Sequence, residues 1–221
     1  MGPVATQTST ADRVEAAALR LFATRGFEGT GIRLIAEEAK ISLASLYNYM
    51  GTKEDLLDRL MQKSMRNLLD PAKEITAVST DPEPRIMQLV DLHVRRHAED
   101  NLLMIVGDTE IRSLTEVSRR NFVALRDAYE RIWEDTVREG VDSGVFTVPD
   151  IKLATFALLQ MCTGVSYWYS PRGRLSLDSV SDGFVGMALN LLRATSPESS
   201  ELKPRHVASA DNKKGGGRDK P

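Results

Sequence analysis

Two histidines with a spacing suited to chemistry, His93 and His97, lie four residues apart in the segment HVRRH. On a helix this spacing puts both imidazoles on one face, where they could bind a metal ion together. No Glu follows the first histidine, however, and the nearby sequence supplies no third ligand. Both histidines also fall on the apolar stripe that carries Leu89 and Val90. We therefore expect hydrogen-bonded core or pocket histidines, and predict no metal site and no cofactor.

Two acidic residues, Asp108 and Glu110, are the next candidates for acid–base chemistry. They lie two residues apart on an expected helix, so their side chains point in different directions and form a poor catalytic pair. A small helical enzyme that combines them with His93 and His97 is the alternative to a binding protein. Because the chain shows no nucleophile–base motif, no glycine-rich phosphate loop and no complete ligand set, we predict that it is not an enzyme.

The most informative segment, IRLIAEEAKISLASLYNYMGTK, runs from Ile32 to Lys53. Two short helical patterns with a turn of about three to four residues between them have the layout of a helix-turn-helix. In the second pattern Leu46 and Met50 are four residues apart and face the core. Hydroxyl groups can reach phosphates, and an asparagine can pair with a base edge, typically adenine. The predicted DNA-contacting side chains of this helix are Ser42, Leu43, Ser45, Tyr47, Asn48 and Tyr49.

Lys53, at the start of the following helix, is a further predicted DNA contact. A cation beside a helix N-terminus would bind a phosphate together with the helix. The layout alone does not decide the function, because many proteins that never bind DNA contain two amphipathic helices joined by a turn.

Composition and charge set the outer limits. The chain has 221 residues, of which 42% are hydrophobic and 27% charged, and a net charge of −2. DNA binding must therefore come from a local surface. The single cysteine, Cys162, lies in an apolar run and fits a packed core residue in a reducing cytosol. The N-terminal residues do not resemble a secretory signal, and no segment approaches the roughly 18 apolar residues of a membrane span, so we expect a cytoplasmic protein without membrane contact.

Helical periodicity runs through the sequence, and strand signals are nearly absent. We predict an all-α fold with an N-terminal three-helix DNA-binding domain and a C-terminal helical bundle for ligand binding and dimerisation. Thr10 is the expected N-cap of the first helix, Gly26 its end, Thr52 the cap of a longer helix, and Pro71 a break. The predicted parts are a flexible N-terminus (1–10), the helix-turn-helix domain (11–55), the bundle (56–195) and a disordered tail (196–221).

The N-terminal segment resembles the TetR family of regulators over about residues 11 to 61. That family has F-x-x-x-G-F/Y at the end of a first helix, then T-S/T-V/I-x-x-I-A, V-S-x-x-x-L/I-Y-x-Y/H-F and x-K-x-x-L. This chain has FATRGF, TGI with IA, IS with LYNYM, and KEDL at the matching places. The resemblance implies a homodimer that binds a palindromic DNA operator, usually as a repressor released by a small ligand. It also adds Thr30 to the predicted DNA contacts.

Three positions depart from the family pattern. Gly31 stands where Ser or Thr is usual, which removes a phosphate contact or a helix cap. Lys40 replaces the turn glycine and would be mildly strained if that site needs a positive φ. Met50 replaces phenylalanine, an apolar exchange that a core tolerates. None of the three removes the recognition helix.

A second segment, from Tyr167 to Leu175, resembles the W-Y-x-P-x-G-x-L signature of TetR-family members that sense acyl-CoA thioesters of fatty-acid or steroid breakdown. Its aromatic side chains could wall a pocket, and its arginines could face an anionic CoA moiety. The alternative is that the aromatics pack in the core or dimer seam and the arginines are solvated. A regulator that has lost its ligand and acts through a protein partner is a third possibility. The predicted ligand-contacting residues are His97, Asp108, Tyr129, Trp133, Met161, Trp168 and Arg172.

The last two helical patterns are apolar on faces wider than one small domain readily buries. Two such helices from each of two subunits would form a four-helix seam, although packing within one subunit is the alternative. A two-fold dimer would match the half-sites of a palindromic operator.

Overall fold

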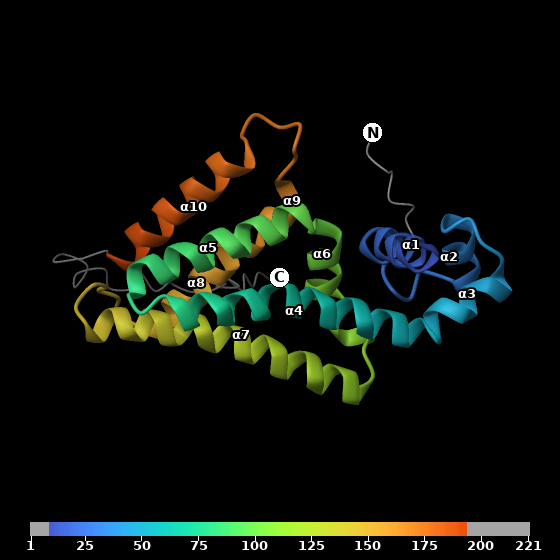
Figure 1. Ribbon diagram of the computed structural model, residues 1–221, viewed down its shortest axis with the longest axis horizontal. Coiled ribbons are helices and arrows are strands. Elements are labelled where there is room, and N and C mark those ends of the chain that lie inside the picture. The colour runs from blue at the N-terminus through green and yellow to red at the C-terminus, as the bar shows by residue number, and fades with distance from the viewer. Residues whose placement is uncertain (1–8, 194–221) are drawn as a thin grey trace, which may run out of the picture.

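The computed structural model describes residues 9–193, and every regular element within that range is a helix (Figure 1). The predicted all-α fold is confirmed. The predicted flexible N-terminus lies mostly, and the predicted disordered tail wholly, outside the described residues. The helices are α1 (Thr10–Arg25), α2 (Ile32–Glu38), α3 (Leu43–Met50), α4 (Lys53–Val78), α5 (Pro82–Glu99), α6 (Asn101–Thr109), the 3-10 turn η1 (Ile111–Ser113), α7 (Glu116–Asp142), α8 (Ile151–Thr163), α9 (Val165–Trp168) and α10 (Leu177–Leu192).

Helices α1, α2 and α3 form a small unit at one end of the molecule (Figure 1). Helix α1 begins at a capping box in which Ser9 accepts from the backbone of Asp12 and the Asp12 carboxylate accepts from that of Ser9. The cap is therefore Ser9, and the prediction of Thr10 was wrong by one residue, because the residue with the extended backbone and the paired hydroxyl is Ser9. The helix ends at Gly26, as predicted, where φ is 74°.

Helix α4 leaves this unit and runs through the larger bundle beside α7 (Figure 1). It begins at the predicted cap, where Thr52 and Asp55 form a second capping box. The predicted domain boundary between residues 55 and 56 falls inside α4, so this helix belongs to both parts. The prediction of a break at Pro71 was wrong. The helix continues past it because Leu68, Leu69 and Ala72 on either side are buried, and this packing offsets the lost backbone hydrogen bond.

Helices α5 and α7 pack against α4, α8 packs against α5 and α7, and α10 packs against α5 and α8 (Figure 1). The short α6 contacts both α1 and α4. The apolar segment from Ile151 to Trp168 forms two helices, α8 and α9, which meet at Gly164. Close packing fixes the α7–α8 connection, because a Cβ on Gly140 would lie 2.0 Å from the Phe146 ring. The bundle therefore holds residues from distant parts of the chain around one interior.

The turn between α2 and α3 contains Lys40, the one non-glycine residue with a positive φ (57°) among residues 9–193. This confirms the strain expected from its place in the sequence. We predict that Lys40→Gly raises the free energy of unfolding by about 1 kcal/mol, because glycine adopts this backbone without a Cβ clash. Urea unfolding of the wild type and the variant measures the difference. Lys40→Ala is the control, since it keeps the Cβ, and an equal gain there would contradict the explanation.

Candidate DNA-binding surface and ligand pocket

The recognition helix predicted from the sequence is α3. Leu46 and Met50 are buried against the small unit, as expected. The predicted contact residues on its other faces are not buried, and Tyr47 and Tyr49 are 50% and 43% exposed. Ser42 is the N-cap, and its hydroxyl accepts from the backbone N–H of Ser45 at 3.1 Å. The helix thus presents two tyrosines and an amide side chain outward, from a backbone held at both ends.

Thr30 and Lys53 do not join this exposed set. Thr30 is fully buried, and its hydroxyl donates to the carbonyl of Gly26 at 2.8 Å, so it stabilises the turn instead of facing outward. The Lys53 ammonium donates to the carbonyls of Phe27 and Thr30 at 3.0 and 3.2 Å and lies 3.9 Å from the centre of the Phe27 ring. Lys53 therefore ties the start of α4 to the loop after α1. Because both side chains are engaged within the protein, neither is available for the DNA contact predicted from the sequence.

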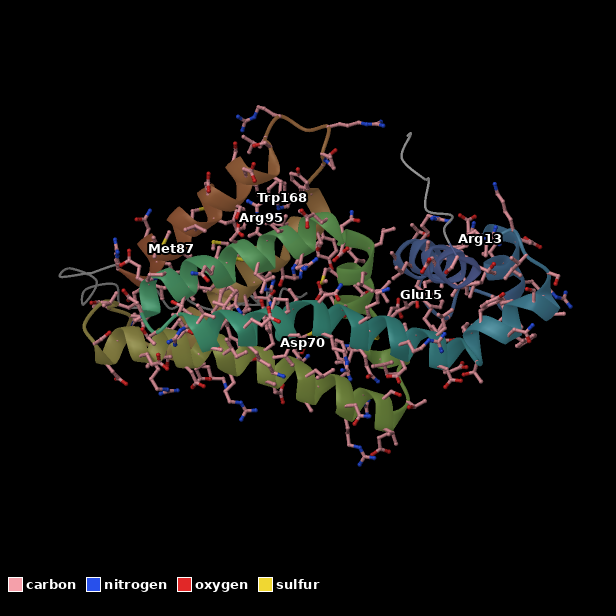
Figure 2. All side chains as sticks on the ribbon, viewed as in Figure 1. Arg13, Glu15, Asp70, Met87, Arg95 and Trp168 are labelled. Atoms are coloured by element: carbon pink, nitrogen blue, oxygen red, sulfur yellow. The ribbon has the colours of Figure 1, made fainter. Side chains whose placement is uncertain are left out.

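Arg59 of α4 holds the other end of the recognition helix, which the sequence analysis missed. Its guanidinium donates to the carbonyls of Met50 and Tyr49 at 3.0 and 3.2 Å. These are carbonyls at the C-terminus of α3, where an intrahelical partner is lacking and a positive charge is favourable. A second link is the Lys63–Glu15 ion pair, at 2.8 Å, on the side of α1 that faces α4 (Figure 2).

The bundle encloses a cavity of about 620 Å³, a size typical of small-molecule sites. Its walls come from α4 to α9, and the exposed residues of its lining are Asp108, Arg126, Phe156, Gln160 and Tyr167. The complete lining is Met65, Leu68, His93, His97, Gly107, Asp108, Ile111, Phe122, Arg126, Tyr129, Glu130, Phe156, Leu159, Gln160, Thr163, Gly164 and Tyr167.

A hydrogen-bonded histidine pair forms one wall of the cavity. The rings of His93 and His97 stack with centroids 4.0 Å apart. Tyr129 and Thr163 each place a hydroxyl 3.0 Å from one ring nitrogen of His93. Burial, and then the neighbouring His97, holds the pKa of His93 well below its usual value, and burial lowers the pKa of His97 to about 4. Both imidazoles are therefore neutral at physiological pH, as expected for pocket histidines.

Asp108 contributes a carboxyl group to the wall formed by α6. Asp108 is an exposed residue of the lining, yet the protein packed around its carboxyl group partly desolvates it and raises its pKa to about 7. Near neutral pH the group therefore carries a proton in a large fraction of molecules. The pKa of Tyr167 is also raised, by burial and by the nearby Asp108. Glu110 belongs elsewhere, because its carboxylate accepts from the Ser113 hydroxyl at 2.9 Å.

Comparison with known proteins identifies the chain. Residues 79–192, more than half of it, match the family model "Tetracyclin repressor-like, C-terminal domain", and residues 16–60 match "Bacterial regulatory proteins, tetR family". The chain belongs to the TetR family. Its members are DNA-binding regulators and not enzymes, which settles the alternative left open by the histidines and acidic residues.

Individual TetR-family relatives resemble the chain over most of its length. It is 28% identical over 179 residues to the transcriptional repressor KstR2 of Mycolicibacterium smegmatis, covering 78% of this chain and 85% of the relative. The crystal structure of PfmR from Thermus thermophilus superposes with a TM-score of 0.73 at 27% identity, covering 81% and 98%. AibR in complex with isovaleryl coenzyme A and operator DNA superposes with a TM-score of 0.71 at 24% identity, covering 81% and 97%.

Of the ligand contacts predicted for this TetR-family chain, the cavity brings together His97, Asp108 and Tyr129. The other predicted contacts lie outside its lining. Trp133 is fully buried behind the wall, with its ring edge-on to Tyr129 at 6.1 Å between centroids, and Met161 is half-buried against the core. Neither residue lines this cavity, because residues on one helix face different neighbours.

Trp168 and Arg172 also lie outside the cavity lining. Trp168 is 53% exposed and stacks on Phe184 of α10 at 6.2 Å, near the α10 side of the bundle (Figure 2). Arg172 is exposed in the loop between α9 and α10. Tyr167, the residue before Trp168, lines the cavity instead. Neither Tyr167 nor Gln160 could be assigned from the sequence, because helical spacing does not show where α8 breaks.

Within residues 9–193 no helix of this TetR-family chain is long and apolar enough to cross a membrane.

The clamp on α3 gives a testable prediction. Arg59→Gln removes the charge that holds the carbonyls of Tyr49 and Met50, so α3 should be oriented less firmly and DNA affinity should fall roughly tenfold. Arg59→Lys keeps the charge without the two-pronged geometry and should lose less. Fluorescence anisotropy with operator DNA measures the affinities. The matched control is Arg66→Gln, an exposed cation on the same helix; an equal loss there would show that only general charge matters.

The neutral histidines predict acid sensitivity. Because the folded pKa of His97 is depressed from 6.5 to about 4, the stability from this residue is intact above pH 6.5 and is lost as pH falls through this range. Between about pH 7 and pH 4.5 the loss should be about 2–3 kcal/mol. Urea unfolding at both pH values, for the wild type and His97→Gln, isolates this contribution, since the opposite effect of Asp108 cancels in the comparison. An identical loss in both proteins would refute it.

Proposed function

We propose that this protein is a homodimeric repressor that binds a palindromic operator through α3 and is released by an acyl-CoA thioester in the bundle cavity. The observation that carries the proposal is that one helix, α4, both clamps the recognition helix through Arg59 and lines the cavity through Met65 and Leu68. A ligand that moves α4 would therefore move α3.

For the DNA-binding part, the exposed face of α3 would enter the major groove. The hydroxyls of Tyr47 and Tyr49 would bind phosphates, and Asn48 would pair with a base edge. The N-terminal end of the helix would contact the DNA through Ser42, Leu43 and Ser45.

For the homodimer, α8 and α10 would form the four-helix seam. Large apolar side chains are exposed on α8, α9, α10 and the loop between α9 and α10, and a partner subunit would cover them. They are Leu153, Phe156, Trp168, Leu175 and Met187. A two-fold dimer would place its recognition helices against half-sites about 34–36 Å apart.

For the effector, the likeness to AibR and the size of the cavity support an acyl-CoA thioester. AibR is described with isovaleryl coenzyme A, and the chain resembles it along most of its length. The acyl group would enter the cavity beside Tyr167. The exposed Arg172 and Arg174, in the loop that follows α9, would then meet the phosphate-bearing part of the thioester outside.

Release would follow from contacts on both sides of the cavity. Besides α4, the wall includes Gly107 and Asp108 of α6, and α6 packs against α1 of the DNA-binding unit. Helices α6 and α4 pack closely, because a Cβ on Gly107 would lie 2.5 Å from the Ser64 hydroxyl. A ligand that separates these helices would change the spacing of the two recognition helices, and a coupling of about 1–3 kcal/mol weakens DNA binding roughly 5–150-fold.

Anisotropy measurements on the DNA upstream of the chain's own gene test this function. We expect tight, salt-sensitive binding, weakened at least about tenfold in Tyr47→Ala with the dimer intact. A saturating thioester should release the wild-type complex. Tight binding that no thioester changes would discard the ligand class and keep the repressor. If neither this DNA nor any sequence from a random-sequence selection binds, the proposed function is wrong.

A further inference from the structure

One hydrogen bond fixes which nitrogen of His97 carries the proton. The Nδ1 atom lies 2.9 Å from the backbone carbonyl of His93. A carbonyl oxygen only accepts, so in the neutral ring Nδ1 bears the hydrogen and Nε2 bears a lone pair. The Nε2 atom is therefore an obligatory acceptor.

The other polar groups of this wall satisfy one another. Both ring nitrogens of His93 are engaged, by the hydroxyls of Tyr129 and Thr163 at 3.0 Å each. By contrast, no side chain or backbone group within residues 9–193 makes a hydrogen bond to Nε2 of His97. Since His97 is part of the cavity lining, its free acceptor is the polar handle that this wall offers to a ligand.

This acceptor restricts the chemistry of the effector. A purely hydrocarbon group that fills the cavity would exclude water and leave the lone pair unpaired, at a cost in affinity. A carbonyl oxygen cannot pair with it, because both are acceptors. A hydroxyl group can, and its own oxygen remains free to accept from a protonated carboxyl such as that of Asp108 in the same cavity.

We propose that the effector carries a hydroxyl group on its apolar part, and that this hydroxyl donates to Nε2 of His97 and accepts from Asp108. The proposal rests on the proposed function, because it treats the bundle cavity as the effector site. The pKa of Asp108, raised to about 7 by burial, supports the donor role near neutral pH. The other ionisable side chains of the lining that surround Asp108 are Arg126, Glu130 and Tyr167.

A matched set of small probes tests the proposal without a CoA group. Decalol, decalone and decalylamine share one bicyclic frame and differ only in a hydroxyl, a ketone or an ammonium group. Calorimetric titration of the full-length protein with each probe, with the substituent at ring carbon 1 or 2, should show decalol binding roughly tenfold to a hundredfold more tightly than decalone. Tighter binding of decalone or of the amine, or no binding of any probe, would overturn the proposal.

Two variants assign the preference to the named atoms. His97→Phe keeps a flat ring against His93 but has no acceptor, so it should bind decalol and decalone equally. Asp108→Asn, on another helix, replaces the carboxyl group by an amide that donates a hydrogen bond at any pH, so it should keep the preference for decalol above pH 7. This second variant keeps the proposal testable if His97→Phe does not fold. Arg119→Gln, at an exposed position of α7 outside the cavity lining, is the control and should leave the preference unchanged.

Operator release separates this inference from the proposed function. If decalol is preferred but no acyl-CoA thioester releases DNA, the thioester proposal fails and the hydroxyl site stands. If thioesters release DNA but a hydroxylated acyl group confers no advantage over its unsubstituted counterpart at any position, the hydroxyl proposal fails alone.

Discussion

The unbroken backbone of α4 is the constraint on which the rest of this molecule depends. Its capping box at Thr52 and Asp55 starts the helix directly after the recognition helix, and its buried face continues past Pro71 into the bundle. A helix is stiff along its axis because each turn is hydrogen bonded to the next. In the proposed mechanism, a displacement where the cavity touches α4 would therefore be carried to the DNA-binding unit, because no flexible linker would absorb it.

The connection works because α4 also contacts the DNA-binding unit through charge. Lys53 and Arg59 both donate to main-chain carbonyls, one pair in the loop after α1 and the other at the end of α3. Carbonyls at such places lack intrahelical partners, and a cation satisfies them better than a neutral donor would. Two positive charges that could have bound DNA thus orient α3, the proposed recognition helix, instead.

The cavity follows the opposite electrostatic rule. Its histidine wall is neutral, and desolvation favours the uncharged form of Asp108, so the α5 and α6 side of the cavity offers hydrogen bonds with little fixed charge. The charged groups of the lining, Arg126 and Glu130, come from α7. Such a wall discriminates by the pairing of donors with acceptors, which is a sharper criterion than apolar fit. The exposed cations Arg172 and Arg174 lie outside, in the loop that follows α9. The division suits an effector with an apolar, hydroxylated part and a charged part.

The sequence by itself determined the helical fold, the recognition helix and the division of its faces, because those properties depend on spacing within one helix. Leu46 inward and Tyr47 outward follow from neighbouring positions on a single turn. Tertiary structure alone decided that Thr30 is buried, and that Tyr167 and not Trp168 lines the cavity. The cavity is assembled from helices far apart in the chain, and which side of each helix meets it depends on packing angles and on breaks such as that at Gly164, which local periodicity does not encode.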